Sequence, residues 1–504
     1  MIRRTITALI AGLSVLALAG CISTSSAQED DETLVLGAIS APVTFDPAGS
    51  DWGNQAPFYQ AVYDTLLRAT PDGRIEPWLA TDWAYDDDET ELTLTIRDDV
   101  TFTDGSALTA DVVKQNLLRF RDGTASNAGN LASIESIDTP DDTTVVIDLA
   151  APDPAMLNYL ARDAGLVGSA ESFDNPDLAT NPVGSGPYVL KPRASVTGTS
   201  YVYRANPDYW NPDVQYYDSL TIDVYTDPTA ALNAIFANEA DAVRVSTNDN
   251  LEQIEASGWS IVGNELDVFG LLLFDRDGAM SEPLGDVRVR QAINYAFDRE
   301  AMLEALQRGH GSVTTQMFPE RSAAYDPALD DRYTYDPQRA RELLAEAGYP
   351  DGFELSMPSS PSLGTTTYTF IAQQLADIGI TVRHDDPGTN FLTDLLAPKY
   401  AASYMALEQN PDWQLAQFML APGATWNPFG TERDEVDAML EQMQYGTDAE
   451  RDEAAAELNQ YLVEEAWFAP FYRAQGSMAV APGTEVEMLT TNAFPAIYDI
   501  RPAD

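Results

Sequence analysis

The sequence predicts an α/β protein built from more than one compact unit. Segments with the alternation of half-buried strands are interleaved with segments of helical spacing, which favours lobes of mixed α/β structure. The chain has 504 residues, more than one ordinary domain contains, and 44% of them are hydrophobic. The length therefore predicts two or three separate cores.

Strands and a capped helix are expected in the first third of the chain. The apolar run 34–39 predicts a short buried strand. Residues 92–96 and 144–149 alternate between apolar and polar side chains, as half-buried strands do. Between them, Thr109 is placed to cap the N-terminus of a helix that has Asp111 in its first turn.

Helical patterns dominate the second half. Apolar residues recur at helical spacing over 286–307. Asp336 followed by Pro337 predicts the start of another helix. A further helix is expected to close at Gly379 and to lead into a strand that begins near Ile380.

The N-terminus has the pattern of an export signal. An apolar run, 8–18, follows two arginines and is too short for a stable membrane span. Small residues precede Cys21, the only cysteine, and this pattern resembles the lipobox of bacterial lipoproteins. We therefore expect a signal peptide at 1–20, lipid attachment at Cys21 and a flexible tether over 21–33. An ordinary signal peptide with a chance cysteine is the alternative.

The charge of the chain limits its partners. There are 80 acidic residues against 28 basic ones, and the formal net charge is −52. Such a surface repels nucleic acid and anionic lipid headgroups, so we expect no nucleic-acid partner and membrane contact only through the lipid on Cys21. The same composition is typical of a salt-loving source, although acidic drift in an arginine-preferring genome explains it equally well.

Recognisable catalytic motifs are missing. The two histidines, His310 and His384, have no second ligand at metal spacing, so we expect no metal site and no cofactor. The sequence contains no Gly-x-Ser-x-Gly elbow, Walker loop or dinucleotide glycine pattern. Carboxylates are too numerous for a catalytic pair to be singled out. These observations favour a protein that is not an enzyme.

Short motifs occur in a fixed order along the chain. The most distinctive are Val62-Tyr63-Asp64-Thr65-Leu66-Leu67, Pro77-Trp78-Leu79-Ala80-Thr81-Asp82-Trp83, Asn181-Pro182-Val183-Gly184-Ser185-Gly186-Pro187-Tyr188, Asn206-Pro207-Asp208-Tyr209-Trp210 and Asp286-Val287-Arg288-Val289-Arg290-Gln291-Ala292-Ile293. Together they resemble the family 5 extracellular solute-binding proteins, the oligopeptide-, dipeptide- and nickel-binding proteins of ABC importers. The family usually has Thr in place of Ser185.

The resemblance implies a two-lobed fold of the periplasmic-binding-protein type (type II, with an extra subdomain) that closes by hinge bending. Lobe one would be discontinuous, with an extra subdomain, and lobe two would be a single stretch of chain. The implied boundaries are 34–52, 169–271 and 471–504 for lobe one, 53–168 for the subdomain and 272–470 for lobe two.

The resemblance also implies a function. The protein would capture an oligopeptide between its lobes, as a monomer at the outer face of the cell membrane, and deliver it to an ABC permease. A sugar or another small solute in the same fold is one alternative. A secreted lipoprotein hydrolase and a sensor that feeds no importer are alternatives of other classes.

A loop of lobe two is the expected ligand contact. In many peptide binders of the family, an aspartate there pairs with the free amine of the peptide. Here Asn410 stands at the matching place, and Asp412 is the nearby substitute. Aromatic side chains in a cleft provide rigid apolar walls. The candidate ligand-binding residues are therefore Trp52, Gln409, Asn410, Asp412, Trp413, Trp426 and Asn427.

Overall fold

One nine-stranded sheet runs through both lobes of the molecule. The computed structural model describes residues 32–503. Within this range the strand order is β10-β11-β12-β1-β13-β19-β14-β18, and β15 also pairs with β19. The strands are β1 (Thr33–Ala38), β10 (Tyr188–Leu190), β11 (Ser200–Ala205), β12 (Ser219–Val224), β13 (Ala242–Arg244), β14 (Ser260–Leu273), β15 (Gly311–Val313), β18 (Ala402–Glu408) and β19 (Phe468–Val480).

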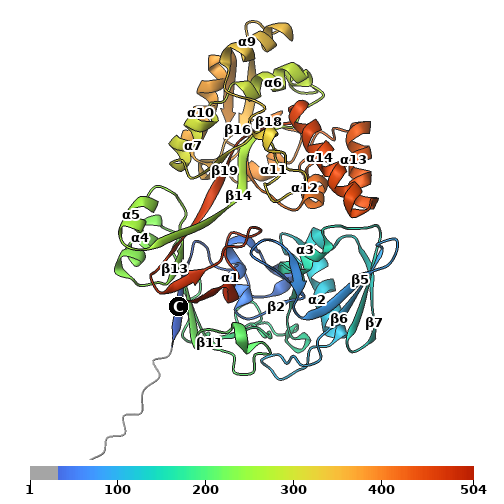
Figure 1. Cartoon of the computed structure of the whole chain (residues 1–504), viewed down its shortest axis with the longest axis vertical. Coiled ribbons are helices and arrows are strands. Elements are labelled where there is room, and N and C mark those ends of the chain that lie inside the picture. The colour runs from blue at the N-terminus through green and yellow to red at the C-terminus, as the bar shows by residue number, and fades with distance from the viewer. Residues whose placement is uncertain (1–31, 504) are drawn as a thin grey trace, which may run out of the picture.

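Two long strands, β14 and β19, carry the chain from one lobe to the other (Figure 1). They pair with each other antiparallel along almost their whole length. In lobe one β19 also pairs with β13, and in lobe two β14 pairs with β18. The β14–β19 register shifts between Glu265 and Asp267 and again between Phe269 and Gly270. Such bulges bend and twist a strand pair locally, so they mark the expected hinge.

Lobe one, with its subdomain, forms the lower body in Figure 1. A four-stranded sheet of order β5-β6-β8-β7 packs against helix α2. Its elements are β5 (Ala80–Tyr85), β6 (Glu91–Ile96), β7 (Ile134–Asp141), β8 (Thr144–Leu149) and α2 (Ala110–Arg121). The rest comprises α1 (Ala56–Gln60), β2 (Asp64–Thr65), β3 (Leu67–Ala69), β4 (Ile75–Pro77), α3 (Met156–Leu160), β9 (Leu166–Val167), α4 (Pro228–Ala237), α5 (Leu251–Ala256), β20 (Thr484–Val486) and β21 (Ile500–Pro502).

Lobe two is the upper body and contains the elements from α6 to α14. A parallel pair, β16 and β17, lies beside α10, and helices α13 and α14 pack together on the side that faces the subdomain. The bounds are α6 (Val287–Tyr295), α7 (Arg299–Gln307), α8 (Pro327–Asp330), α9 (Pro337–Glu346), β16 (Phe353–Pro358), α10 (Thr365–Asp377), β17 (Ile380–Asp385), α11 (Phe391–Leu395), α12 (Asp412–Met419), α13 (Asp434–Tyr445) and α14 (Asp448–Glu464).

Several local predictions are confirmed. The strands expected at 34–39, 92–96 and 144–149 are β1, β6 and β8. The Thr109 hydroxyl accepts from the Val112 amide at the start of α2, as a capping residue does. The pattern of side chains within each segment is therefore enough to explain these strands and the start of this helix.

The helix expected over 286–307 is in fact two helices, α6 and α7. The chain leaves the first helix after Tyr295, and Asp298 caps the second by accepting from the Ala301 amide. An aspartate that can cap its own N-terminus competes with an uninterrupted helix. Continuous apolar periodicity did not reveal this break.

The motifs of lobe one converge on Asp64. Its buried carboxylate accepts hydrogen bonds from the Trp78 and Trp210 indoles at 2.9 and 3.1 Å, from Ser185 at 2.7 Å and from Tyr209 at 3.1 Å. Burial raises the pKa of Asp64, whereas these four donors act in the opposite direction. Four separate motifs are thus joined by one carboxylate, which explains why they occur together.

The glycines of the 181–188 motif allow the chain to pass close to the segment that carries Asp64. A Cβ atom on Gly184 would lie 2.0 Å from the Val62 carbonyl oxygen, and one on Gly186 would lie 2.6 Å from the Val62 carbonyl carbon. No other residue fits at these two positions without a backbone shift.

Candidate ligand-binding site

Ionic contacts cross from lobe one to lobe two. The Arg162 guanidinium donates to the Glu408 carboxylate at 2.7 Å and to the Asn410 side-chain oxygen at 3.2 Å. Arg162 follows α3 in the subdomain, and Glu408 ends β18 in lobe two. Burial acts against the cation, but the charges of Glu408 and Asp163 raise the pKa of Arg162. The lobes are therefore in contact across a charged cleft.

A second carboxylate faces this contact. Asp267 on β14 lies directly opposite Glu408 on β18 in the antiparallel register, so both side chains point to the same face of the sheet. Burial, with a smaller contribution from the charge of Glu408, raises the pKa of Asp267 to about 6. Asp267 forms no ion pair within 4 Å among residues 32–503. The charge of Arg244 acts on the pKa of Asp267 in the opposite direction, so this part of the cleft combines two carboxylates with two arginines, Arg162 and Arg244.

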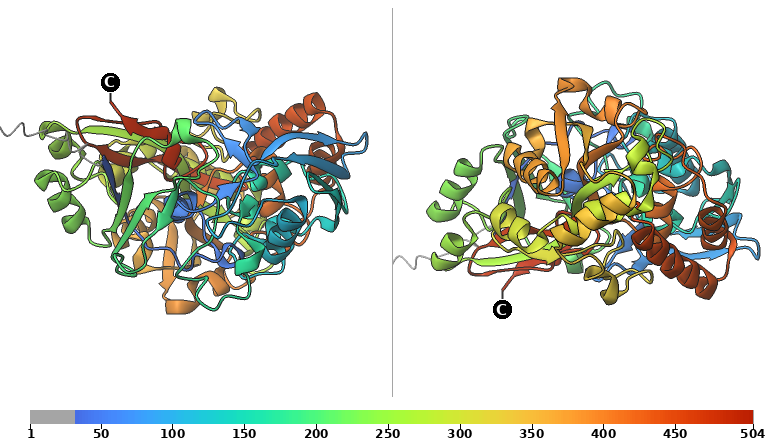
Figure 2. Two further views of the ribbon diagram at one scale, coloured as in Figure 1. Left: turned by 90° about the horizontal axis from the view of Figure 1, so that it is seen from below. Right: turned by 90° about the horizontal axis from the view of Figure 1, so that it is seen from above.

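Helices α13 and α14 overlap with the subdomain when the molecule is viewed along its long axis (Figure 2), and they contact it at the outer edge of the cleft. The Gln444 amide donates to the Pro152 carbonyl at 3.0 Å, and Arg451 pairs with Glu89 of the subdomain. Trp413 and Met443 of lobe two belong to the same buried apolar cluster as Met156 of lobe one. Apolar packing and ion pairs thus hold the lobes in a closed arrangement.

Two adjoining cavities lie between the lobes. The larger, about 440 Å³, has walls from both lobes that include Asn158, Asp412, Trp413 and Arg451. The second, about 430 Å³, extends along the hinge strands, where Glu265 and Arg473 lie. The two cavities share Pro319 and Arg321. They therefore adjoin each other, and both are lined by side chains of both signs of charge.

A third cavity, about 270 Å³, lies where lobe one meets the hinge strands. Its lining includes Asn54, Arg244, Asp267, Phe269 and Gln475. The Asn54 side-chain oxygen and the Arg244 Nε atom are buried there without a hydrogen-bond partner among residues 32–503. Buried polar groups without partners cost stability unless a ligand or water satisfies them.

Four of the sequence-predicted residues lie at this cleft. Asp412 and Trp413 line the largest cavity, and Gln409 lines the second. Asn410 contacts Arg162 of the opposite lobe. Burial raises the pKa of the Asp412 carboxyl. The sequence indicated this loop as a whole, and these four of its residues do lie at the cleft.

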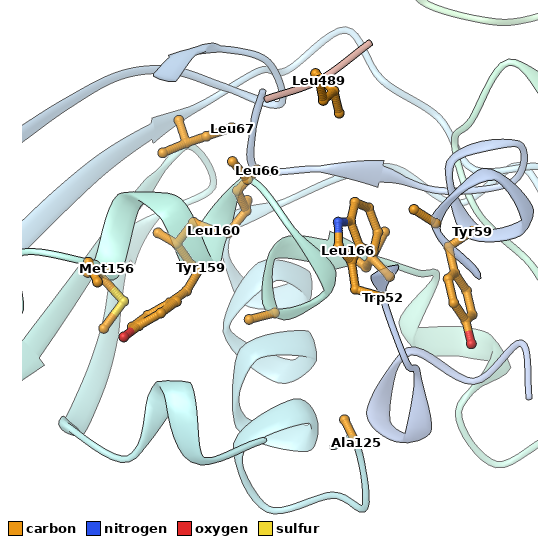
Figure 3. Packing of buried hydrophobic residues seen from close by; sticks show 14 of the residues in the cluster. Trp52, Tyr59, Leu66, Leu67, Ala125, Met156, Tyr159, Leu160, Leu166 and Leu489 are labelled. Carbon is orange, nitrogen blue, oxygen red and sulfur yellow. The ribbon is translucent and has the colours of Figure 1, made fainter. Parts of the chain in front are cut away.

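The other three predicted residues lie away from these three cavities. Trp52 is 3% exposed and packs in the core of lobe one with Tyr59 and Leu166 (Figure 3). Trp426 is buried beside Phe418 at 5.3 Å between ring centroids. Asn427 closes its own loop: its side chain donates to the Thr431 carbonyl at 2.9 Å and accepts from the Thr431 amide.

Further predictions concern other parts of the molecule. Cys21, the signal peptide at 1–20 and most of the tether at 21–33 lie outside the described residues. The expected boundaries near 271 and 470 fall inside β14 and β19, the two strands shared by both lobes. Among residues 32–503 no group of three or more potential metal-ligating side chains occurs. The same range contains no helix with the length and apolarity that a membrane span requires.

Sequence reasoning missed the charged residues at the cleft, namely the Arg162–Glu408 pair, which joins the lobes, and Arg244, Asp267 and Arg321, which line its cavities. Arg162 and Glu408 are separated by 246 positions, so no local pattern relates them. Asp267 is an acidic residue within an apolar strand pattern, and that was the one local signal available.

The chain was compared with known proteins. A model of the bacterial extracellular solute-binding proteins, family 5 (middle part), matches residues 74–432. The chain belongs to this family. This family 5 protein is 30% identical over 392 residues to the glutathione-binding protein GsiB of Salmonella typhi, covering 74% of this chain and 72% of that one. It is also 30% identical over 393 residues to heme-binding protein A of Haemophilus influenzae, covering 68% of each chain.

A solved structure shows the same fold. The family 5 chain superposes on the ABC transporter-associated periplasmic binding protein DppA of Helicobacter pylori, in complex with the peptide STSA, with a TM-score of 0.77 at 20% identity. The match covers 94% of this chain and 98% of that one. The predicted family and the two-lobed fold are thereby confirmed, and the protein is a substrate-binding protein of the ABC transporter type.

Proposed function

We propose that this protein binds an oligopeptide between its lobes and delivers it to an ABC permease. The observation that carries the proposal is the pair of adjoining inter-lobe cavities, which are lined by both acidic and basic side chains. Cavities of about 300–1,000 Å³ are usual for ligand sites, and the two adjoining cavities lie in that range. A short peptide with charged ends suits such a lining.

The ends of the peptide have candidate partners. Asp267 lies beside Glu408 and has no ion-pair partner within 4 Å among residues 32–503, so its carboxylate would accept hydrogen bonds from the amine of a peptide. Arg244 and Arg321 are both largely buried, and both line inter-lobe cavities. Their guanidinium groups would donate hydrogen bonds to the carboxylate of a peptide. The free Nε atom of Arg244 supports this role.

Contacts along the peptide would come from the lobe-two loop. Gln409, Asn410, Asp412 and Trp413 are proposed as ligand contacts because they lie at the cleft. Trp413 lines the larger cavity, where its indole ring would form a rigid apolar wall against the peptide. Trp52, Trp426 and Asn427 would support the cleft from behind.

Relatives of this chain are named for different ligands. Glutathione is a peptide with a free amine and two carboxylates, so the chemistry attributed to GsiB agrees with a lining of both charges. A heme would need a broad apolar slot, whereas the larger of the two adjoining cavities has five charged side chains in its lining, namely Asp412, Asp448, Asp452, Arg321 and Arg451. The lining therefore favours a peptide over heme.

Export, anchoring and oligomeric state complete the proposal. The mature protein would be a lipid-anchored monomer at the outer face of the cell membrane, held there through Cys21, and would use no catalytic group or cofactor. Its proposed domain boundaries are the ones that the family resemblance implies, with lobe one in three segments, the subdomain at 53–168 and lobe two at 272–470.

The test is a binding experiment on the chain that begins after Cys21. Native mass spectrometry of the gently purified protein, followed by denaturation, would release any peptides that it carries. Calorimetry with a defined tripeptide and its N-acetylated form then probes amine recognition. We expect acetylation to weaken binding at least about tenfold, since it removes a charge-assisted hydrogen bond.

A matched pair of variants locates the contact. Asp267→Asn should remove most of the preference for the free amine, whereas Asp174→Asn, on the exposed surface of lobe one, should not. Equal binding of the free and acetylated peptides by the native protein would contradict amine recognition. A sugar released in place of peptides would contradict the oligopeptide proposal itself.

A further inference from the structure

Arg276 is a buried cation outside the inter-lobe cleft. It follows β14 by three residues and is 1% exposed. Its guanidinium stacks over Trp467 at 4.3 Å and approaches Phe468 at 5.1 Å, both distances measured to ring centroids. The preceding Asp275 does not serve as its partner, because the Asp275 carboxylate accepts from the backbone amides of residues 279–281.

The guanidinium lacks hydrogen bonds. None of its three nitrogens has a partner among residues 32–503. Arg299 provides the contrast within the same lobe: its buried guanidinium donates to the Pro470, Asn294 and Tyr333 carbonyls and to the Asn294 side chain. Burial lowers the pKa of both arginines to about 9. Oxygen atoms of the protein thus accept hydrogen bonds from Arg299, whereas the described partners of the Arg276 guanidinium are aromatic rings.

The surroundings of Arg276 are positive. The charges of Arg290 and Arg433 are close enough to lower its pKa further, after burial. The neighbouring carboxylates are already engaged: Asp277 pairs with Arg433 at 2.7 Å, and Glu465 lies 3.6 Å from Arg290. A cation–π contact compensates for only part of the hydration free energy that a cation loses on burial. A bound anion would compensate for the rest.

We propose that Arg276 binds a small inorganic anion of the halide class, which would be chloride in the surroundings of the protein. Full burial of the guanidinium favours a small ion, and a single charge is easier to dehydrate than the two charges of sulfate or phosphate. The anion would accept from the free N–H groups of Arg276.

The place in the fold suggests a structural role for the anion. Arg276 follows the lobe-two end of β14, and Trp467 and Phe468 stand at the lobe-two end of β19. The bound anion would therefore stabilise the junction of both hinge strands with lobe two. The role is independent of which solute occupies the cleft.

Bromide provides a direct probe. Crystals of the chain that begins after Cys21, grown or soaked in sodium bromide, should show an anomalous peak within hydrogen-bonding distance of the Arg276 nitrogens. A map with ordered water there, and with no bromide, would overturn the proposal. This measurement uses the native protein and does not depend on a variant folding.

Chloride-dependent stability provides the second measurement. At constant ionic strength, with gluconate replaced by chloride, a tenfold rise in chloride should raise Tm by about 1–2 °C. Arg276→Met keeps an apolar stem over Trp467 and should lose this chloride response. Arg308→Met, at an exposed residue paired with Asp249, should keep it. An equal response in the native protein and Arg276→Met would contradict the site.

Discussion

Asp267 and Glu408 face each other across neighbouring antiparallel strands, and only Glu408 has an arginine, Arg162, as an ion-pair partner within 4 Å. Like charges directly opposite each other in a sheet are destabilising. Natural proteins retain such an arrangement where function requires it. The pair therefore marks the acidic part of the cleft, and the charge of Arg244 also acts there on Asp267.

The first prediction concerns the pH dependence of stability. The pKa of Asp267 is about 6 in the folded protein against 3.8 ordinarily. Between pH 4 and pH 6 the folded state holds a proton that the unfolded state has lost, so stability falls as pH rises through this window. Asp267→Asn should therefore unfold at higher urea concentration at pH 7.5, with a gain of about 2–3 kcal/mol, and should change little at pH 4.

Glu408→Gln is the matched control for that measurement. It also removes one carboxylate of the pair, but it leaves the buried Arg162 with a weaker acceptor. We expect this variant to be less stable at pH 7.5, in contrast to Asp267→Asn. A loss of stability in both variants would show that the two carboxylates do not repel each other.

A second prediction concerns lobe closure. Arg162→Met removes the ionic contact with Glu408 and the hydrogen bond to Asn410. The ratio of closed to open molecules should fall about tenfold, which corresponds to about 1–2 kcal/mol. Small-angle scattering without ligand should then give a larger radius of gyration. Arg501→Met, which breaks an exposed pair with Glu485 inside lobe one, should leave the radius unchanged.

A third prediction tests Asp64 as the centre of lobe one. Asp64→Asn replaces an acceptor of four hydrogen bonds by a group that also carries two donors, so at least one buried partner loses its bond. We expect a loss of about 2–4 kcal/mol in chemical unfolding. Asp208→Asn, at an exposed position of the same lobe, serves as the control. Equal stability of both variants would contradict the role of the four-donor network.

A fourth prediction compares two glycines. Gly184→Ala places a Cβ atom 2.0 Å from the Val62 carbonyl oxygen, so the chain must shift and lobe one should lose about 2–4 kcal/mol of stability. Gly129→Ala meets nothing within 4 Å and should change stability by less than about 0.5 kcal/mol. Thermal unfolding of the two variants side by side makes the comparison. A near-native Tm for Gly184→Ala would show that this turn relaxes easily.

Elements governed by local chemistry were predictable from the sequence. The caps formed by Thr109 and Asp336 act within three residues, so the start of each helix could be predicted from the sequence. At Asp298 the apolar period continues across the break, so periodicity alone does not separate the two helices, although an aspartate there suits a helix cap. Local signals compete at such places, and packing decides the outcome.

The cleft was predictable only in part. The loop from Gln409 to Trp413 was found through family resemblance, and it does lie at the cleft. Trp52 and Trp426 were predicted to contact the ligand, but both are buried. An aromatic side chain suits the wall of a cleft and the interior of a core equally well, so residue type alone does not distinguish the two. Arg162 could not be found at all, because its partner comes from a distant part of the chain.

The continuous strands β14 and β19 have a mechanical consequence. The chain crosses between the lobes twice, and the two crossing strands are hydrogen-bonded to each other. Separating the lobes therefore bends a two-stranded ribbon, and no segment has to fold or unfold. The hydrogen-bonded ladder resists sliding of one strand along the other, and the bulges near Asp267 and Gly270 are the places where the ribbon bends and twists. The relative position of the lobes then depends on the bend and twist of this one ribbon. A membrane partner that docks on both lobes at once would sense the bound solute through the shape of that ribbon.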